Sequence, residues 1–131
     1  MNMDKNIEAA DHDPAGYALI GACFEVYNEK GSGFLEEVYQ ECLEMELTDR
    51  GIPFVTHPKL RLFYKGRPLQ KTYEADLIVC GEIIVELKAV KAFLPEHEAQ
   101  LINYLKATGK KIGYLVNFGA FPRLDWRRRI V

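Results

Sequence analysis

The segment YEADLIVCGEIIVELKAV holds four acidic residues and one basic residue, of which Asp76, Glu86 and Lys88 interrupt its apolar runs. The segment reads as two strands joined through Gly81, and apolar residues on both faces indicate strands inside a sheet. A hairpin centred on Gly81 places Asp76, five residues before it, opposite Glu86, five residues after it. Lys88, two residues beyond Glu86, then lies on the same face. The sequence therefore predicts two carboxylates and one ammonium group at one spot.

This arrangement of charges is costly unless a cation lies between the carboxylates. Like charges directly opposite in a sheet destabilise it by about 0.2–1 kcal/mol, and burial adds the cost of removing water from each carboxylate. A divalent cation removes the conflict, because Mg²⁺ or Mn²⁺ takes oxygen ligands from carboxylates, water and phosphate. A lysine beside such a metal can hold or deprotonate a bound water. The set is therefore typical of metal-assisted hydrolysis of a phosphodiester.

The same residues also fit a structural interpretation. Lys88 could simply pair with Glu86 or Asp76 on a hydrated face, since a motif of three charged residues is weakly specific. The register is itself an assumption, because a two-residue turn would place Asp76 and Glu86 on opposite faces of the sheet. The residues alone leave these alternatives open.

Helical and strand patterns surround the charged segment. Pro14 at a first helical position, with Asp13 as N-cap, favours a helix start. Residues 1–12 are predicted to be a flexible N-terminal tail and residues 13–131 a single domain. The order α-α-β-β-β-α-β predicts a mixed α/β domain on a small sheet. We expect helices over 14–30, 34–50 and 95–108, strands over 54–56, 60–64, 68–70, 73–79, 83–89 and 112–118, and a last edge strand within 123–131.

Composition excludes several classes of protein. With 131 residues, 48% hydrophobic and 27% charged, the chain has the mix of a globular domain. The longest run without charge or strong polarity, 15–24, is about half of what a bilayer requires, so no membrane span is expected. The acidic N-terminus does not read as a secretory signal. Three widely spaced cysteines, without a CxxC pair, predict small core residues and a cytoplasmic location.

Charge is unevenly distributed along the chain. Residues 1–50 carry 3 basic and 12 acidic groups, whereas residues 51–131 carry 14 basic and 7 acidic groups. The second part could present a basic face that attracts a polyanion, or the two parts could neutralise each other in the fold. The run Arg127-Arg128-Arg129 has the same two interpretations, a grip on a nucleic-acid backbone or an exposed charged tail.

Further motifs, taken in order along the chain, resemble a known family. Residues 33–39 read G-x-x-E-x-x-Y, residues 86–88 read E-x-K after Asp76, and residues 100–104 read Q-x-x-x-Y. From about residue 14 to residue 120 the series resembles the GxxExxY proteins of the PD-(D/E)XK nuclease-like superfamily. One departure is that Ala75, and not proline, precedes Asp76. The resemblance implies an α/β (α+β) restriction-endonuclease-like αβββαβ core, with a small central mixed sheet flanked by helices and an extra N-terminal helix.

The resemblance also implies a role for each matching residue. Asp76 and Glu86 would be the core metal ligands, with the backbone carbonyl of Leu87 as a further ligand. Glu36 would be an added acidic ligand or an aid to the metal-bound water. Lys88 would activate or orient the attacking water. Gln100 and Tyr104, one helical turn apart, would organise the site and contact the nucleic acid.

The leading hypothesis is therefore a nuclease that depends on Mg²⁺ or Mn²⁺ and acts on nucleic acid. DNA is the first choice of substrate in this hypothesis, and RNA is the second. A catalytically silent module that keeps the fold and binds nucleic acid is the second hypothesis, and a phosphoesterase of small substrates is the third. Tyr39, at helical spacing with Leu35 and Cys42, is predicted to be a core aromatic. Assembly state stays open, although a second subunit in a homo-oligomer would help a 15.0 kDa domain to grip a duplex.

Overall fold

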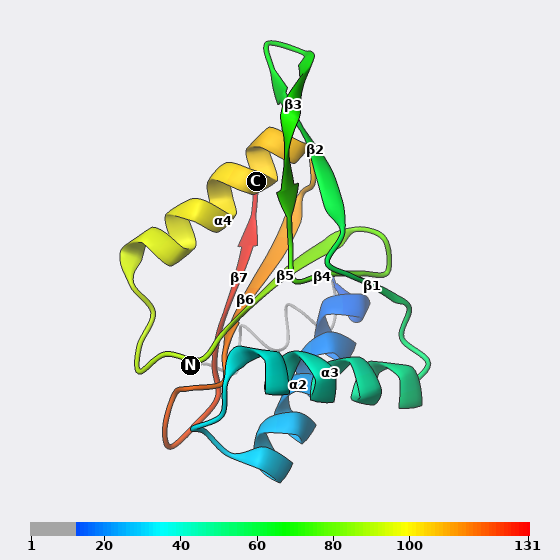
Figure 1. Cartoon of the computed structure of the whole chain (residues 1–131). Coiled ribbons are helices and arrows are strands. Elements are labelled where there is room, and N and C mark those ends of the chain that lie inside the picture. Colours follow the sequence, from blue (N-terminus) through cyan, green and yellow to red (C-terminus); the bar gives the residue numbers. More distant parts are fainter. Residues whose placement is uncertain (1–12) are drawn as a thin grey trace.

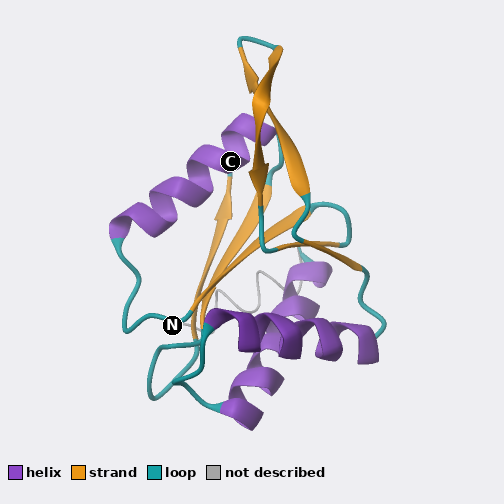
Figure 2. Ribbon diagram, in the orientation of Figure 1, coloured by secondary structure: helices purple, strands orange, loops and turns teal. Residues whose placement is uncertain are grey.

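The computed structural model describes residues 13–131, so the tail predicted for residues 1–12 lies outside the described part. The described residues form an α+β fold in which a mixed sheet lies between helices (Figures 1 and 2). The helices are α2 (Pro14–Lys30), α3 (Glu36–Asp49) and α4 (Pro95–Thr108). The strands are β1 (Phe54–Thr56), β2 (Lys59–Tyr64), β3 (Arg67–Glu74), β4 (Leu77–Val79), β5 (Ile83–Lys88), β6 (Ile112–Asn117) and β7 (Asp125–Ile130).

Five strands form the main sheet in the order β1-β4-β5-β6-β7. β4 and β5 are antiparallel, and Leu77 pairs with Val85. This register is the one expected for a hairpin centred on Gly81, so that prediction is confirmed. β5 and β6 are parallel, and α4 supplies the crossover between them, as a parallel connection requires. β7 pairs antiparallel with β6 at the edge of the sheet, which confirms the predicted last strand.

The strand predicted over 73–79 is wrong in one respect, because the chain bends in its middle. β3 ends at Glu74 and β4 starts at Leu77, so Ala75 and Asp76 belong to neither strand. β3 pairs only with β2, in a separate two-stranded sheet that is longer than the hairpin predicted from sequence. The bend follows from a contact with the segment before β2, since the Ala75 amide donates to the Pro58 carbonyl at 3.1 Å and not to β5.

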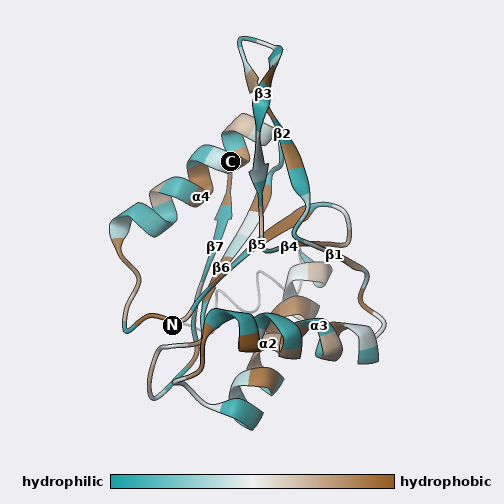
Figure 3. Ribbon diagram, in the orientation of Figure 1, coloured by the Kyte–Doolittle hydropathy of each residue, from teal (hydrophilic) through white to brown (hydrophobic). Residues whose placement is uncertain are grey.

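Apolar side chains fill both sides of the main sheet. α2 and α3 pack against one face through a cluster that includes Leu19, Leu43 and Val85. α4 packs against the other face through Leu101 and Leu105, which belong to one buried cluster with Ile84. Figure 3 shows hydrophilic residues along much of α4, and Leu101 and Leu105 are the residues that the helix buries. Strands buried on both faces explain why β4 and the first half of β5 read as continuous apolar runs.

A buried carboxylate ties α2 to the last two strands. Asp13 is 2% exposed, and its Oδ1 accepts the Gly16 amide at 3.0 Å as the N-cap of α2. Its Oδ2 accepts the Tyr114 hydroxyl at 2.7 Å and Nε of Arg128 at 3.1 Å. The predicted cap is therefore confirmed, and the same side chain bridges α2, β6 and β7.

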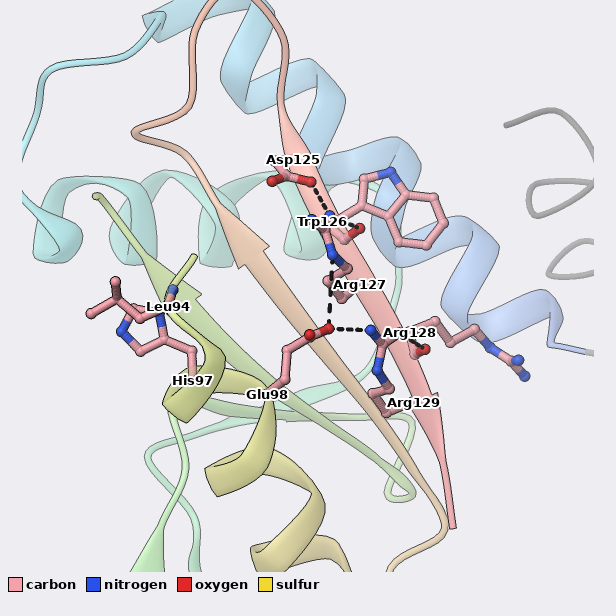
Figure 4. A network of polar contacts seen from close by, with 8 residues as sticks. All are labelled: Leu94, His97, Glu98, Asp125, Trp126, Arg127, Arg128 and Arg129. Atoms are coloured by element: carbon pink, nitrogen blue, oxygen red, sulfur yellow. Dashed lines mark hydrogen bonds and ion pairs between the residues drawn. The ribbon is translucent and has the colours of Figure 1, made fainter. Parts of the chain in front are cut away.

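The three consecutive arginines are not a free basic run. Arg127 and Arg129 both form ion pairs with Glu98 at the start of α4 (Figure 4), and Arg127 also pairs with Asp125. With Arg128 held by Asp13, each of these charges has a partner within the fold. The exposed charged tail is therefore not what the structure shows, because all three side chains join β7 to neighbouring elements.

The three cysteines differ in burial. Cys23 is buried in the core, Cys42 is half-buried beside it, and Cys80 is exposed in the turn after β4. The prediction of small core residues is therefore wrong for Cys80. None of the helices within residues 13–131 has the length and apolar character that crossing a membrane demands.

Candidate metal and catalytic site

Asp76 lies at the bend between β3 and β4. There its side chain, and not a backbone carbonyl, accepts the hydrogen bond of the facing strand residue. Its Oδ2 accepts the backbone amide of Leu87 at 2.7 Å. Its own carbonyl accepts the amide of His57 at 2.9 Å and the side-chain amide of Gln40 at 3.0 Å. With its backbone and side chain both bonded, the half-buried carboxylate is fixed in position.

Glu86 lies next to Asp76, in the middle of β5. Its Oε1 accepts the Asp76 amide at 3.2 Å, and its Oε2 accepts the Tyr73 hydroxyl. Burial raises the pKa of Glu86 to about 7, and repulsion from the nearby Asp76 carboxylate acts in the same direction, although the Tyr73 bond opposes it. The two predicted carboxylates therefore meet, and their proximity disfavours ionisation of both in the absence of a cation.

Tyr73 is a member of the site that the sequence analysis missed. Besides its bond to Glu86, its ring stacks on that of Tyr104, with centroids 3.8 Å apart and an interplanar angle of 4°. Burial, together with the neighbouring charge of Glu86, raises the pKa of the Tyr73 hydroxyl well above its usual range. Tyr73 therefore stays a neutral donor to Glu86, and it links Tyr104 to the carboxylate pair.

The backbone at Leu87 faces the bend, because the ladder between β4 and β5 stops there. A continued ladder would pair Leu87 with Ala75, but the Ala75 amide goes to Pro58 and the Leu87 amide goes to Asp76. The amide and carbonyl of one strand residue point to the same side of the strand. The Leu87 carbonyl therefore also points toward Asp76, where the resemblance implies that it acts as a ligand.

A cleft of about 640 Å³ opens at this point between α3 and the sheet. Asp76 and Leu87 line it from the sheet, and Glu36 and Gln40 line it from α3. Three of the predicted metal ligands thus share one cleft, and the fourth, Glu86, adjoins it through Asp76. Glu36 is exposed and makes no hydrogen bond to any described residue. The remaining lining is strongly acidic and includes Glu37, Glu41 and Glu44.

The G-x-x-E-x-x-Y residues position the start of α3. Gly33 has φ +112°, which only glycine adopts readily. The hydroxyl of Tyr39 donates to the Gly31 carbonyl at 2.5 Å and accepts the Phe34 amide at 3.2 Å. Tyr39 is fully buried, which confirms the core interpretation of this residue. The motif therefore fixes the loop before α3 and, with it, the position of Glu36 in the first helical turn.

Lys88 and Gln100 do not contact the carboxylate pair. Lys88 is half-buried and lies on the same face of β5 as Glu86, as strand alternation requires. Its ammonium forms no ion pair within residues 13–131, so the alternative in which Lys88 merely pairs with a carboxylate is not observed. Gln100 and Tyr104 share a separate cavity of about 520 Å³ on α4, together with Asn103.

The few protein ligands at this site suit an ion such as Mg²⁺, which keeps several bound waters, better than an ion that needs all of its ligands from the protein. In the described part of the chain no group of three or more His, Cys, Asp or Glu side chains converges as a ligand set. Two adjacent carboxylates and one backbone carbonyl are present, and Mg²⁺ typically takes one or two carboxylates and keeps several waters. Burial, with a smaller contribution from the Asp76 carboxylate, raises the pKa of Glu86, and a divalent cation beside the pair would favour its charged form. The residues present therefore fit the implied metal.

Two of three comparisons with known proteins gave matches. A family model described as PD-(D/E)XK nuclease superfamily matches residues 13–129. Among solved structures, the crystal structure of SSO0001 is similar in fold, with a TM-score of 0.56 and 16% sequence identity. The similarity covers 96% of this chain and 61% of the SSO0001 chain, so this chain spans less than two thirds of that protein. No curated protein matches.

Proposed function

The chain belongs to the PD-(D/E)XK nuclease superfamily, and from this membership we propose that it hydrolyses phosphodiester bonds in nucleic acid with the aid of Mg²⁺ or Mn²⁺. The observation that carries the proposal is the adjacency of Asp76 and Glu86, two carboxylates that the fold holds together at the end of a broken ladder. Within the superfamily we assign the chain to the GxxExxY proteins, on the motif at residues 33–39.

Asp76, Glu86 and the Leu87 carbonyl are the proposed metal ligands, and Glu36 contacts the metal or its water from across the cleft. A bound divalent ion supplies charge neutralisation for the phosphate and lowers the pKa of a bound water. Asp76 is held by the Leu87 amide and Glu86 by Tyr73, so both carboxylates are oriented before any ion arrives. Such preorganisation avoids the cost of ordering ligands during the reaction.

Lys88 is the proposed group that orients the attacking water as an ammonium or, as the neutral amine, accepts its proton. Lys88 follows Glu86 by two residues on β5 and lies on the same face. Its side chain therefore starts on the side of the strand where Glu86 lies. Because it forms no ion pair with residues 13–131, the ammonium is available to water or phosphate. A cation at this place also stabilises negative charge that develops on the phosphate.

Gln100 and Tyr104 are the proposed contacts to the nucleic acid from α4. Their support is the cavity that they share and the stacking of Tyr104 on Tyr73, which touches Glu86. We infer that the nucleic acid is DNA, because the exposed hairpin of β2 and β3 carries basic side chains on both strands. We further infer a reducing compartment such as the cytoplasm, because all three cysteines are free.

The proposal is tested by metal binding and cleavage in the same preparations. We expect Mn²⁺ binding by calorimetry, and cleavage of DNA that requires Mg²⁺ or Mn²⁺ and stops with EDTA. Glu86→Gln should lose both, whereas Lys88→Ala should bind Mn²⁺ but not cleave. The matched controls are Glu82→Gln and Lys106→Ala, which remove exposed charges outside the site.

Two results would contradict the proposal. Cleavage that survives both Glu86→Gln and Lys88→Ala in contaminant-free protein would remove the site assignment. Mn²⁺ binding without cleavage of any single-stranded or double-stranded substrate would instead support the catalytically silent module. The observation that favours the catalytically silent module is that the described residues lack a third converging acidic ligand.

A further inference from the structure

The hairpin of β2 and β3 stands apart from the rest of the fold. It forms its own two-stranded sheet and projects beyond the main sheet and α4 (Figure 1). Only Leu62 and Tyr73 of the two strands are buried, and both lie where the hairpin meets α4 and β5. Beyond them the ribbon is exposed on both faces as far as its Lys65-Gly66 turn. Because so little of the hairpin is buried, packing of the core does not explain why its outer part is present.

The ribbon carries a high density of unpaired positive charge. Residues 59–74 hold five basic side chains and a single acidic one, Glu74. None of the five forms an ion pair with any residue in 13–131. Figure 3 shows much of the outer part of β3 as hydrophilic. The basic residues, distributed over both strands and the turn, are Lys59, Arg61, Lys65, Arg67 and Lys71.

An aromatic side chain lies among the charges at the tip. Tyr64 is 55% exposed and has the Lys65 ammonium 5.5 Å from its ring centroid and the Arg67 guanidinium 6.0 Å from it. Tyr64 is paired with Arg67 across the ribbon, so these groups share one short stretch of the hairpin. A tip with two cations around an exposed ring has the chemistry of a nucleic-acid contact.

The base of the ribbon is attached directly to the candidate site. β3 leads into Asp76 through Ala75, and Tyr73 of β3 bonds Glu86. At the other end of the hairpin, His57 precedes β2 and donates its amide to the Asp76 carbonyl. The cleft at the site is acidic and repels phosphate unless a cation is bound, whereas the ribbon beside it attracts phosphate. The two surfaces therefore complement each other in holding a polyanion.

We propose that the β2–β3 ribbon enters the major groove of duplex DNA and so places one strand of that duplex at the Asp76–Glu86 site. The major groove of B-DNA is about 12 Å wide and admits a two-stranded β-ribbon. The corresponding groove of A-form RNA is deep and too narrow for side chains to read. A ribbon that is exposed on both faces and cationic on both strands suits a groove walled by two phosphate backbones. The inference rests on the proposed function and names its substrate as duplex DNA.

The test is DNA binding in EDTA, where no cleavage takes place, measured by anisotropy of a labelled duplex at several salt concentrations. The double variant Lys65→Gln/Arg67→Gln removes two charges at the exposed tip. We expect the salt dependence of its log K to be shallower by about 2, at roughly 0.9 for each phosphate that the variant no longer neutralises. At about 0.1 M salt this corresponds to binding weaker by on the order of 50-fold. The matched control Lys106→Gln/Lys111→Gln removes two exposed charges elsewhere and should bind like the unmodified protein.

Competition then identifies the ligand. Unlabelled duplex DNA should displace the probe far better than double-stranded RNA or single-stranded DNA of the same sequence. Equal binding of single-stranded DNA, with a loss on Tyr64→Ala that exceeds the loss on the double variant, would replace the groove by base stacking on Tyr64 and overturn the inference. Unchanged affinity and salt slope in the double variant would overturn it as well.

The outcomes separate this inference from the proposed function. If the double variant binds duplex normally and metal-dependent cleavage is observed, the ribbon inference fails and the nuclease stands. If the double variant loses duplex binding but the unmodified protein cleaves nothing with Mn²⁺, the ribbon inference stands and the nuclease fails. Circular dichroism of the double variant checks that its fold is retained, which is expected because both side chains are exposed.

Discussion

Asp76 and Leu87 face each other where the β4–β5 ladder stops, and the Asp76 carboxylate accepts the Leu87 amide at 2.7 Å. One side chain thus has two tasks, since the proposed metal ligand also satisfies a buried backbone donor. Removal of the carboxylate should therefore affect stability and metal binding to different extents, depending on what replaces it. The two effects can be separated by comparing substitutions at this one position.

Asp76→Ala should destabilise the fold and abolish cleavage, whereas Asp76→Asn should abolish cleavage and leave the stability of the fold nearly unchanged. Alanine leaves the Leu87 amide buried without an acceptor, at a cost of about 1–3 kcal/mol. Asparagine keeps an acceptor oxygen but loses the charge that holds the metal. Urea unfolding and Mn²⁺ titration of both variants measure the two effects. Equal unfolding free energies for the two variants would contradict the dual role.

Glu86→Gln should alter how stability depends on pH in the metal-free protein. The folded-state pKa of Glu86 is raised from 4.5 to about 7, so its contribution to stability is fully present below 4.5 and is lost as pH rises through about 7. Glutamine has no proton to lose. Relative to the unmodified protein, Glu86→Gln should gain on the order of 2–3 kcal/mol in unfolding free energy between about pH 4 and about pH 8.5. Urea unfolding in EDTA at both pH values is the measurement.

Addition of Mn²⁺ provides the check on that prediction. The ion should stabilise the unmodified protein at the higher pH and leave Glu86→Gln nearly unchanged, because binding to the folded state alone raises stability. If the stability difference between the two proteins is the same at both pH values, burial and the neighbouring Asp76 carboxylate do not raise the pKa of Glu86.

Tyr73→Phe should shift the pH dependence of metal binding without disturbing the packing. The Tyr73 hydroxyl bond lowers the pKa of Glu86 against the larger effect of burial. Without that bond the carboxylate holds its proton to a higher pH, so the midpoint of Mn²⁺ binding against pH should move upward. The phenylalanine ring can still stack on Tyr104. Tyr17→Phe removes an exposed hydroxyl on α2 as control, and an identical binding curve for Tyr73→Phe would exclude this coupling.

Asp13→Ala should be among the most destabilising single substitutions in the domain. It removes the N-cap of α2 and leaves the Tyr114 hydroxyl and the Arg128 guanidinium without their buried partner. Breaking one side of a buried ion pair costs about 3–5 kcal/mol. Asp13→Asn keeps a capping oxygen and should lose less. Unfolding by urea gives both values, and an equal loss for the two variants would show that the cap contributes nothing.

Much of the main sheet could be predicted from sequence because its determinants are local. The Gly81 turn fixes the register of the strands on either side of it, so the positions of Leu77 and Val85 follow from counting. The proximity of Asp76 and Glu86 follows from the same register. The helix from Pro14 was predictable from its cap and its first proline.

The bend at Ala75 was not predictable in this way, because it depends on a distant partner. The Ala75 amide is drawn to Pro58, and nothing in the apolar pattern of 73–79 marks that contact. The pairing of Arg127 and Arg129 with Glu98 is likewise set by the tertiary position of α4. Gln40 could have been noticed, since it lies four residues after Glu36 and therefore on the same helical face.

The bond between Asp13 and Arg128 also constrains when the chain can finish folding. The two residues are separated by 115 positions, so the contact closes almost the whole of the described chain. Contacts of such separation form late, because the entropy of closing the loop must first be offset. During synthesis from the N-terminus α2 is made long before the arginine that completes its end. Nascent chains therefore carry that helix end incomplete until the last strand leaves the ribosome.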